Sequence, residues 1–354
     1  MKQVKTGALV LCCLLLISVL AGCKPPAGGQ QTGDGVYKIY FNYFDTVSYV
    51  YSYAGAPAER FEELSAGISG ILTEYHRLFD IYHEYSGINN LCTVNRLAGG
   101  DPLPVDPKLI DFLLYAKDLH EKTDGEMNIL LGSVLKIWHD HRTQALDDPS
   151  AATLPDQAAL EEAARHTDIS LLEIDVEKGT VRLADAAAAI DVGAVGKGYA
   201  TEKAAEYLQQ QGAASYVLNI GGNIRIIGQK PDGSGWNTAV KDPEDPENSY
   251  AAILKIADTA CVTSGNYERF FAVSGKQYHH IIDPDTLWPA EYFASVTVVT
   301  RDSGLADVLS TALFCMSYED GLALANALGG VDVLWIEHDG TLRYTDGLAD
   351  KFTN

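Results

Sequence analysis

The second half of the chain carries a run of short strand-like segments that restricts its fold more than any other feature. Between residues 215 and 300 the segments "SYVLNIGGNIRIIG", "WNTAVKD", "AAILKIAD", "CVTSG", "ERFFAVSG" and "ASVTVVT" follow one another, with turn residues between them. Strands joined by short turns pair in antiparallel fashion, whereas parallel strands need a crossover of about a dozen residues. The pattern therefore predicts an α+β fold with mainly antiparallel sheets flanked by helices, rather than a doubly wound parallel sheet.

Helices and further hairpins are expected around this run. Asp106-Pro107 opens a helical pattern that stops at Gly125, and Lys178-Gly179 is typical of a hairpin turn. Apolar residues at helical spacing predict the other helices. The expected elements are hairpins at 37–53, 171–185 and 331–346, and helices at 58–82, 106–125, 304–316 and, as one short helix, within 147–168.

The N-terminus reads as an export signal. Lys2 and Lys5 precede an apolar run that is too short for a membrane-spanning helix, and "LAGC" at its end resembles a bacterial lipobox. We expect Cys23 to be lipidated, which would hold the protein on the outer side of the cell membrane by acyl chains; the alternative is an uncleaved anchor. The expected organisation is a lipoprotein signal peptide (1–22), a lipidated cysteine with a Pro/Gly-rich tether (23–35) and one folded domain (36–354).

The charge balance limits the partners of this chain. The sequence has a formal net charge of −22, and loss of the signal leaves 24 basic residues against 48 acidic ones. Such a chain does not suit nucleic acid, and any anionic ligand must be met by a local site of backbone N–H groups, a metal ion or both. The cysteines that remain, Cys92, Cys261 and Cys315, have no CxxC spacing and are expected to be mostly buried, and nothing supports a disulfide.

Two glycine-rich segments suggest close approach to a ligand. In "AIDVGAVGKGYATEKAAEYL" a strand ends at Asp191 and the glycine turn runs into an amphipathic helix, whose N-terminus offers N–H groups to an anion. The alternative is a plain strand-to-helix link. Gly221 and Gly222 interrupt a strand pattern and predict a bulge, a bend or a close backbone contact.

The segment "GLADVLSTALFCMS" carries a candidate metal site. Asp307 and Thr311 are four residues apart, so both lie on one face of the expected helix. Carboxylate and hydroxyl oxygens suit a hard cation such as Mg²⁺. The alternative is a solvated surface aspartate.

Five segments in this order resemble the ApbE family of FAD:protein FMN transferases: "AIDVGAVGKGYATE", "VLNIGGNIRIIG", "CVTSGNYERFF", "YHHIIDPDT" and "ADVLSTALF". The similarity runs from about Tyr43 to the C-terminus. It implies an ApbE-like, T-fold-related single domain with two lobes. It also implies a transferase that binds FAD with Mg²⁺ and joins FMN to a threonine or serine hydroxyl of an exported or membrane redox protein, with release of AMP.

The resemblance also implies roles for individual residues. His280 would activate the acceptor hydroxyl, Asp283 would orient His280 or share this role, and His279 would be a neighbour. The Ala194 carbonyl, Asp307 and Thr311 would bind the metal. The implied FAD contacts are Tyr82, Glu126, Met127, Asn128, Asp191, Lys197, Thr263, Ser264, Gly265 and Ile281.

The sequence departs from the family pattern at two places. Glu126, Met127 and Asn128 replace small, aromatic and acidic residues, and Leu287 with Trp288 replaces a glycine turn. These changes leave two alternatives open: an FAD pyrophosphatase that yields FMN and AMP, and a non-catalytic flavin-binding lipoprotein. Retention of the metal pair with His280 and Asp283 argues against the second, since storage does not require them together.

Overall fold

The computed structural model describes residues 30–32, 35–53 and 57–353. The predicted signal peptide, Cys23 and most of the predicted tether lie outside the described residues. None of the described helices is long and apolar enough to cross a membrane.

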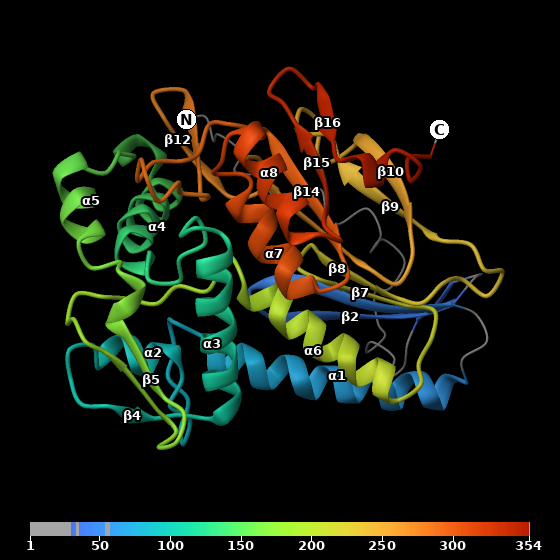
Figure 1. The fold of residues 1–354 in the computed structure, drawn as a ribbon, viewed down its shortest axis with the longest axis horizontal. Coiled ribbons are helices and arrows are strands. Elements are labelled where there is room, and N and C mark those ends of the chain that lie inside the picture. The colour runs from blue at the N-terminus through green and yellow to red at the C-terminus, as the bar shows by residue number, and fades with distance from the viewer. Residues whose placement is uncertain (1–29, 33–34, 54–56, 354) are drawn as a thin grey trace, which may run out of the picture.

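A nine-stranded antiparallel sheet forms the centre of the described fold (Figure 1). Its strand order is β1-β2-β3-β7-β8-β11-β14-β15-β16, so most neighbours in the sheet are also neighbours in sequence, as predicted. The strands are β1 (Gln30–Thr32), β2 (Gly35–Tyr43), β3 (Thr46–Tyr53), β7 (Tyr216–Ile220), β8 (Asn223–Ile227), β11 (Ala260–Gly265), β14 (Ser295–Thr300), β15 (Asp332–Ile336) and β16 (Leu342–Tyr344).

Three small antiparallel sheets and eight described α-helices complete the fold. The small sheets are β4 (Leu103–Pro104) with β6 (Thr180–Leu183) and β5 (Leu172–Asp175); β9 (Trp236–Lys241) with β10 (Tyr250–Ile256); and β12 (Phe270–Val273) with β13 (Lys276–His279). The helices are α1 (Ala58–Phe79), α2 (Leu91–Arg96), α3 (Pro107–Lys122), α4 (Gly132–Asp147), α5 (Gln157–Ala164), α6 (Gly196–Gln210), α7 (Ser303–Ala312) and α8 (Tyr318–Leu328), with short 3₁₀ turns at Pro149–Ala151, Ile169–Leu171 and Asp346–Leu348.

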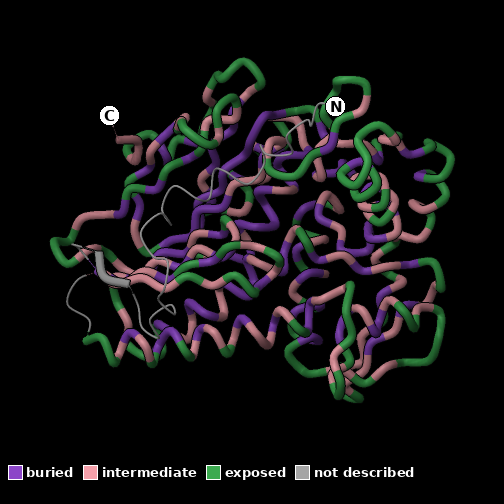
Figure 2. The backbone as a smooth tube through the Cα atoms, turned by 180° about the vertical axis from the view of Figure 1, so that it is seen from behind, coloured by how far each residue is buried: buried purple, intermediate pink, exposed green. Residues whose placement is uncertain are grey.

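The elements form two lobes. In the larger lobe, α1, α6 and α7 cover one face of the central sheet and the β9–β10 hairpin packs on the other (Figure 1). The smaller lobe contains α2 to α5 and the β4–β6–β5 sheet. Figure 2 shows that the buried residues follow the sheet and the inner sides of the helices, whereas the connecting loops are exposed. The core of the larger lobe continues into α3, so the two lobes share one interior.

The long helix α1 follows from its apolar spacing. Its buried positions recur every three or four residues and include Phe61, Leu64, Ile68 and Leu72, which is the stripe of an amphipathic helix. The next predicted helix, α3, begins as expected: the Asp106 carboxylate accepts a hydrogen bond from the Lys108 N–H at 2.8 Å, with Pro107 at the first position.

The structure corrects the bulge and the bend predicted at Gly221 and Gly222, whereas a close contact is present: a Cβ on Gly221 would lie 2.4 Å from the Thr46 Oγ1. The two glycines do not bulge or bend one strand; they form the two-residue turn between β7 and β8, where Ile220 pairs with Asn223. Both have positive φ, 57° and 94°, as the tight hairpin turns with right-handed twist require. The glycine pair therefore reverses the chain within the sheet.

Three described helices, α2, α4 and α8, were not predicted from the sequence. Helix α8 does carry a signal, because Ser317 caps it and Glu319 and Asp320 fill its first turn. Helix α4 carries none at its start, where Leu131 occupies the capping position and gives no side-chain hydrogen bond. The three described cysteines are free thiols, and Cys261 and Cys315 are buried, as expected of small hydrophobes.

Helices α6 and α7 approach closely at Gly198, and this contact can be tested by mutation. A Cβ on Gly198 would lie 2.4 Å from both the Asp307 Cβ and the Ser303 carbonyl oxygen. Gly198→Ala should therefore force the helices apart and lower the free energy of unfolding by about 1–3 kcal/mol.

The matched control is Gly70→Ala, at a solvent-exposed position in the middle of α1, where an added Cβ meets nothing within 4 Å. It should raise stability by about 0.5–1 kcal/mol, because alanine favours helix. Urea denaturation measures both variants. Equal effects of the two substitutions would contradict close packing at Gly198.

Candidate active site

The glycine-rich segment that opens α6 packs directly on α7. The Gly198 N–H donates a hydrogen bond to the Asp307 Oδ2 at 2.8 Å, and the Lys197 Nζ lies 3.7 Å from the same oxygen. Lys197 also donates to the Gly193 carbonyl at 3.1 Å, and the Gly193 N–H donates to the Asp191 Oδ1 at 2.8 Å. The turn and the buried Asp307 carboxylate are therefore one unit.

A group of hydroxyls lies beside this unit, where α7 meets the end of β11. The Ser264 Oγ is 2.9 Å from the Ser310 Oγ and 3.3 Å from the Thr311 Oγ1. Thr263 is bonded across the sheet to Thr297, with 2.8 Å between their hydroxyls. The predicted pair Asp307 and Thr311 thus borders the predicted "TSG" segment.

The donors at this place fit a hard cation. They are a carboxylate, a hydroxyl and the carbonyls of the glycine turn, and the Asp307 Oδ1 has no hydrogen-bond partner among the described residues. The described residues contain no group of three or more His, Cys, Asp or Glu that could hold a metal. A site here would therefore rely on one carboxylate together with neutral protein oxygens, as magnesium sites that also use phosphate oxygens and water do.

His280 follows directly after β13, and no hydrogen bond to its ring nitrogens is found in the described part of the chain. Its Nδ1 is buried without a partner. Burial lowers the pKa of His280 to about 3, and the nearby cations Arg269, His279, Arg142 and Lys197 add to the effect. The ring is therefore neutral at pH 7 and able to accept a proton. His279 differs, because its Nε2 hydrogen-bonds the Ala290 carbonyl at 2.9 Å, as a structural neighbour would.

Asp283 holds a turn rather than the histidine ring. Its Oδ1 accepts hydrogen bonds from the N–H groups of Asp285 (2.8 Å) and Thr286 (3.0 Å). No hydrogen bond joins Asp283 to His280 in the described residues, and the Asp283 Oδ1 is used within its own loop. That Asp283 orients His280 or shares its role stays a prediction.

Leu287 and Trp288, which replace the glycine turn of the family pattern, attach the turn after His280 to α4. Leu287 has a φ of 64°, in the left-handed region that favours glycine, and its carbonyl accepts a hydrogen bond from the Trp138 Nε1 at 3.0 Å. The rings of Trp288 and Trp138 are 5.2 Å apart, and the Trp288 Nε1 donates to the Gln157 Oε1 at 2.6 Å. The changed residues therefore bind the turn to the smaller lobe.

Tyr82 is exposed and faces α4. Its hydroxyl lies 3.4 Å from the Nδ1 of His139. Burial raises the pKa of Tyr82, and the Asp191 carboxylate adds to this, whereas Arg142 and Arg269 lower it. His139, Arg142 and Arg269 thus belong to the same region as Tyr82 and Asp191, although sequence reasoning missed them. For Arg269 a signal existed, its place within "CVTSGNYERFF"; for the two α4 residues there was none.

Residues 126–128 lie mainly against protein. The Met127 side chain is 2% exposed, in the core of the larger lobe. Asn128 donates to the Thr167 carbonyl at 2.8 Å and accepts from the Leu130 N–H at 2.9 Å. Ile281 is buried too. Gly265 packs against the ring of Tyr267, because a Cβ at this position would lie 2.6 Å from that ring. The side chains of Met127, Asn128 and Ile281 therefore have structural partners in this conformation.

Glu126 is the unusual member of this segment. Its Oε2 is buried without a hydrogen-bond partner. Burial raises the pKa of Glu126 to about 7, and the carboxylates of Asp285 and Asp283 add to the shift. Glu126 therefore lies close to the turn that follows His280.

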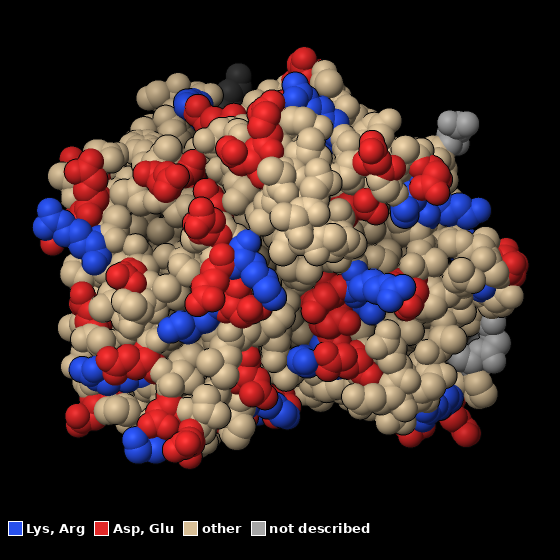
Figure 3. All heavy atoms as spheres, in the orientation of Figure 1, with Lys and Arg blue, Asp and Glu red and all other residues tan. Residues whose placement is uncertain are grey.

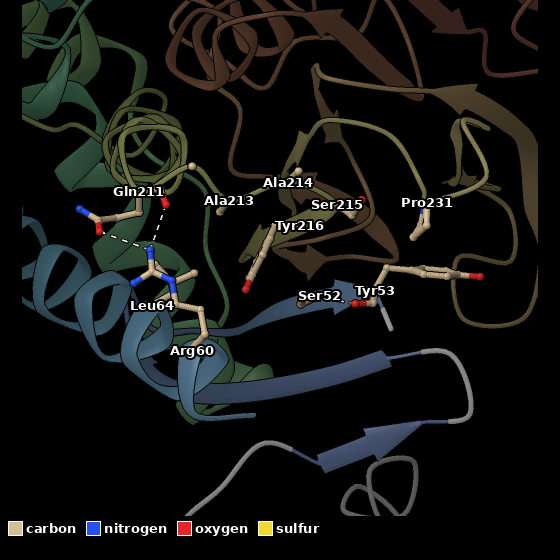
Figure 4. A pocket seen from close by; sticks show the side chains of 11 residues that line it. Ser52, Tyr53, Arg60, Leu64, Gln211, Ala213, Ala214, Ser215, Tyr216 and Pro231 are labelled. Carbon is tan, nitrogen blue, oxygen red and sulfur yellow. Dashed lines mark hydrogen bonds between the residues drawn. The ribbon is translucent and has the colours of Figure 1, made fainter. Parts of the chain in front are cut away.

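A separate pocket of about 280 Å³ lies away from these residues, where the start of α1 meets the end of α6 (Figure 4). Arg60 spans it and donates to the Gln211 carbonyl at 2.9 Å. None of the predicted site residues lines this pocket, and its one arginine is already bonded. We therefore assign the candidate site to the glycine turn, α7 and the β12–β13 hairpin.

Comparison with known proteins identifies the family. The sequence model of the ApbE family matches residues 45–335, most of the chain. The chain belongs to the ApbE family. The FAD:protein FMN transferase of Treponema pallidum is 34% identical over 275 residues, 74% of each protein. The FAD:protein FMN transferase of Vibrio cholerae is 28% identical over 347 residues, 97% of this chain and 98% of the relative.

The fold agrees with this membership. The crystal structure of the ApbE protein from Thermotoga maritima matches with a TM-score of 0.78 and 25% identity, over 90% of this chain and 100% of that one. The predicted family and the predicted α+β class with mainly antiparallel sheets are therefore confirmed.

The position of Glu126 leads to a prediction for stability. In the folded protein its pKa is about 7, against an ordinary value of 4.5. Between these values the folded state binds more protons than the unfolded state, so Glu126 costs stability as the pH rises from 4.5 through 7. Glu126→Gln removes this titration, so its unfolding free energy should rise relative to that of the wild type as the pH increases from about 4.5 to 8.

Urea denaturation across this range is the measurement. Glu121→Gln, at an exposed position near the end of α3, is the reference for loss of a surface carboxylate. A difference for Glu126→Gln that does not change with pH would contradict the burial of its carboxyl group.

Proposed function

We propose that this protein is a magnesium-dependent FAD:protein FMN transferase, which joins FMN to a threonine or serine hydroxyl of an exported or membrane redox protein and releases AMP. Membership of the ApbE family, with curated relatives named FAD:protein FMN transferase, makes the chain an enzyme of the transferase class that uses FAD. The dependence on magnesium, the kind of acceptor protein and the release of AMP are proposed in addition.

One observation carries the proposal. The glycine turn, the Asp307–Thr311 pair and the segment around His280 come from distant parts of the sequence and converge on one place. The Lys197 ammonium lies 3.7 Å from the Asp307 carboxylate, and the ring of His279, next to His280, packs on Phe314 just after α7 with ring centroids 5.5 Å apart. Phosphoryl transfer requires this combination of anion positioning, charge neutralisation and a group that accepts the hydroxyl proton.

In the proposed step, the acceptor hydroxyl oxygen bonds to the phosphorus of the FMN half of FAD. The bond from that phosphorus to the bridging oxygen breaks, and the oxygen leaves with AMP. His280, neutral at pH 7, takes the hydroxyl proton and returns it to solvent or to the AMP phosphate. An anion bound among the surrounding cations raises the pKa of His280, which makes it a stronger base.

Other residues of the chain hold the reactants. Asp307, Thr311 and the Ala194 carbonyl would bind magnesium, which supplies charge neutralisation for the phosphate oxygens. Lys197 and the N–H groups of the glycine turn would face the pyrophosphate, and Tyr82 would face the flavin ring. Asp283 keeps the turn after His280 in place.

We also propose that the enzyme acts outside the cytoplasm, tethered to the cell membrane through a lipid on Cys23. This fits acceptors that are exported or exposed at the membrane. Labelling of growing cells with radioactive palmitate and comparison of the wild type with Cys23→Ala tests it: only the wild type should carry label.

The direct test of transfer uses residues 24–354, which include all of the described fold, with FAD, magnesium and a purified exported flavin-acceptor domain. The intact mass of the acceptor should rise by one FMN less one water, and AMP should appear in equal amount. Conversion of FAD to free FMN and AMP without a mass gain would instead indicate a pyrophosphatase, and intact FAD would indicate a binding protein.

Two variants test the roles of the residues. Asp307→Asn should lower the magnesium-dependent rate by at least about 100-fold, as loss of a required charge in a transition state does. His280→Gln should lower the transfer rate by about 100-fold or more while FAD still binds. Asp118→Asn, an exposed change on α3 that breaks only a surface pair with Lys122, is the control. Normal rates for Asp307→Asn would remove the metal assignment.

A further inference from the structure

Two arginines near the candidate site lack any charged partner among the described residues. Arg142 on α4 and Arg269 just before β12 form no ion pair and donate no hydrogen bond to a protein acceptor within the ranges that the structure describes. On the face shown in Figure 3, by contrast, most basic side chains lie beside acidic ones. Many basic residues of the chain form ion pairs, as Lys108 does with Glu74 and Lys203 with Glu206. In a chain with a net charge of −22, two arginines left without an acidic partner require an explanation.

The fold fixes Arg142 near Arg269. Trp138, one helical turn before Arg142, packs on the β12–β13 hairpin, with ring centroids 6.3 Å from Phe271 and 6.4 Å from Tyr278. Residues four apart on a helix lie on one face, so Arg142 points towards the same hairpin. Trp138 is buried and donates to the Leu287 carbonyl, which fixes α4 in this position.

The hairpin register places Arg269 beside His280. Phe270 pairs with His279 in the antiparallel ladder, so the next residues outward, Arg269 and His280, lie opposite each other at its end. Arg142 comes three residues after His139, whose ring contacts the Tyr82 hydroxyl. The two arginines therefore flank the region between Tyr82 and His280.

Unsatisfied polar atoms mark the same place. The Nε of Arg142 and the Nδ1 of His280 are both buried without a hydrogen-bond partner. Such atoms cost free energy unless a ligand or water completes them. The pKa of Arg142 is lowered by burial and then by Arg269, so the two positive charges repel each other. A bound anion would accept the missing hydrogen bond and would offset the repulsion between the two arginines.

We propose that Arg142 and Arg269 form a clamp that binds the phosphate oxygens of FAD from the side opposite the Asp307 metal site. The proposal rests on the proposed function. A guanidinium presents two parallel N–H donors that match phosphate geometry, and a strongly acidic protein needs local positive charge to hold a dianion. The clamp makes α4, a helix of the smaller lobe, part of the substrate site.

Ligand binding without an acceptor and without magnesium tests the clamp. Residues 24–354 in EDTA are titrated with FAD, ADP and riboflavin, which separate the pyrophosphate from the flavin ring. Arg142→Gln and Arg269→Gln should each weaken FAD and ADP by about tenfold or more, as loss of a charge-assisted hydrogen bond does, and should leave riboflavin unchanged. Arg142→Lys keeps the positive charge but not the two parallel N–H donors, so it should weaken FAD and ADP binding less than Arg142→Gln does.

Arg165→Gln, at the C-cap of the neighbouring helix α5, is the matched control, since Arg165 forms only an exposed pair with Glu162 at 3.2 Å. It should bind all three ligands as the wild type does. Thermal melting checks the fold of each variant, and Arg269→Gln, at an exposed turn, decides the result if Arg142→Gln is unstable.

The possible outcomes separate the two proposals. Unchanged FAD and ADP binding in both variants would overturn the clamp and leave the transferase proposal standing. An equal loss for riboflavin would also overturn it, because the arginines would then act on the flavin ring or on the fold. A wild-type protein that binds no FAD even with magnesium added would overturn both.

Discussion

The hydrogen bond from the Gly198 N–H to the Asp307 carboxylate is the contact on which the site depends. It joins the first turn of α6 to a helix more than one hundred residues later in the chain. The strand predicted to end at Asp191 is not formed, since β6 ends at Leu183 and only an isolated bridge at Ala189 lies between it and α6. Only glycine at position 198 permits the contact between α6 and α7, since a Cβ would overlap the aspartate and the Ser303 carbonyl. The contact brings the carbonyls of the turn, the Lys197 ammonium and the Asp307–Thr311 face of α7 to the end of β11. One short backbone contact therefore assembles the candidate metal and phosphate site.

The second constraint is the attachment of the β12–β13 hairpin to α4. Leu287 accepts a left-handed backbone, which costs a non-glycine residue of the order of 1 kcal/mol. Its carbonyl receives the Trp138 indole hydrogen bond, and its side chain is buried in the core formed with α4. The replacement of a glycine turn by "LW" thus has a structural reason: it anchors the smaller lobe to the loop that carries His280, and the anchored helix supplies His139 and Arg142.

Much of the fold and part of the site follow from the sequence. The apolar stripe of α1, the Asp106-Pro107 start of α3 and the adjacent strands of the second half are local patterns, and local patterns are what a sequence displays. Asp307 and Thr311 were found because helical spacing puts them on one face. Lys197 was found through the resemblance to the ApbE family, which covers the glycine-rich segment that contains it. The structure then adds the contact between turn and helix that no spacing reveals.

The remainder depends on tertiary contacts. Gly221 and Gly222 look the same in sequence whether they bend a strand or end a hairpin, and the pairing of Ile220 with Asn223 decides it. Arg142 is one of several charged residues on α4, and only the packing of Trp138 on the β12–β13 hairpin shows that the Arg142 side chain points towards that hairpin. Glu126 is an ordinary carboxylate in the sequence; burial next to Asp283 and Asp285 makes it unusual.

The measurement that tests the central claim most directly is a crystal structure with FAD and Mn²⁺, an ion with the same oxygen preference as Mg²⁺ and a strong anomalous signal. Convergence of the glycine turn, α7 and the hairpin on one substrate site predicts an anomalous peak at Asp307 and Thr311. It also predicts the FAD pyrophosphate between that peak and the Arg142–Arg269 pair. FAD bound elsewhere, for example in the pocket beside Arg60 and Gln211, with no metal at Asp307, would contradict the account.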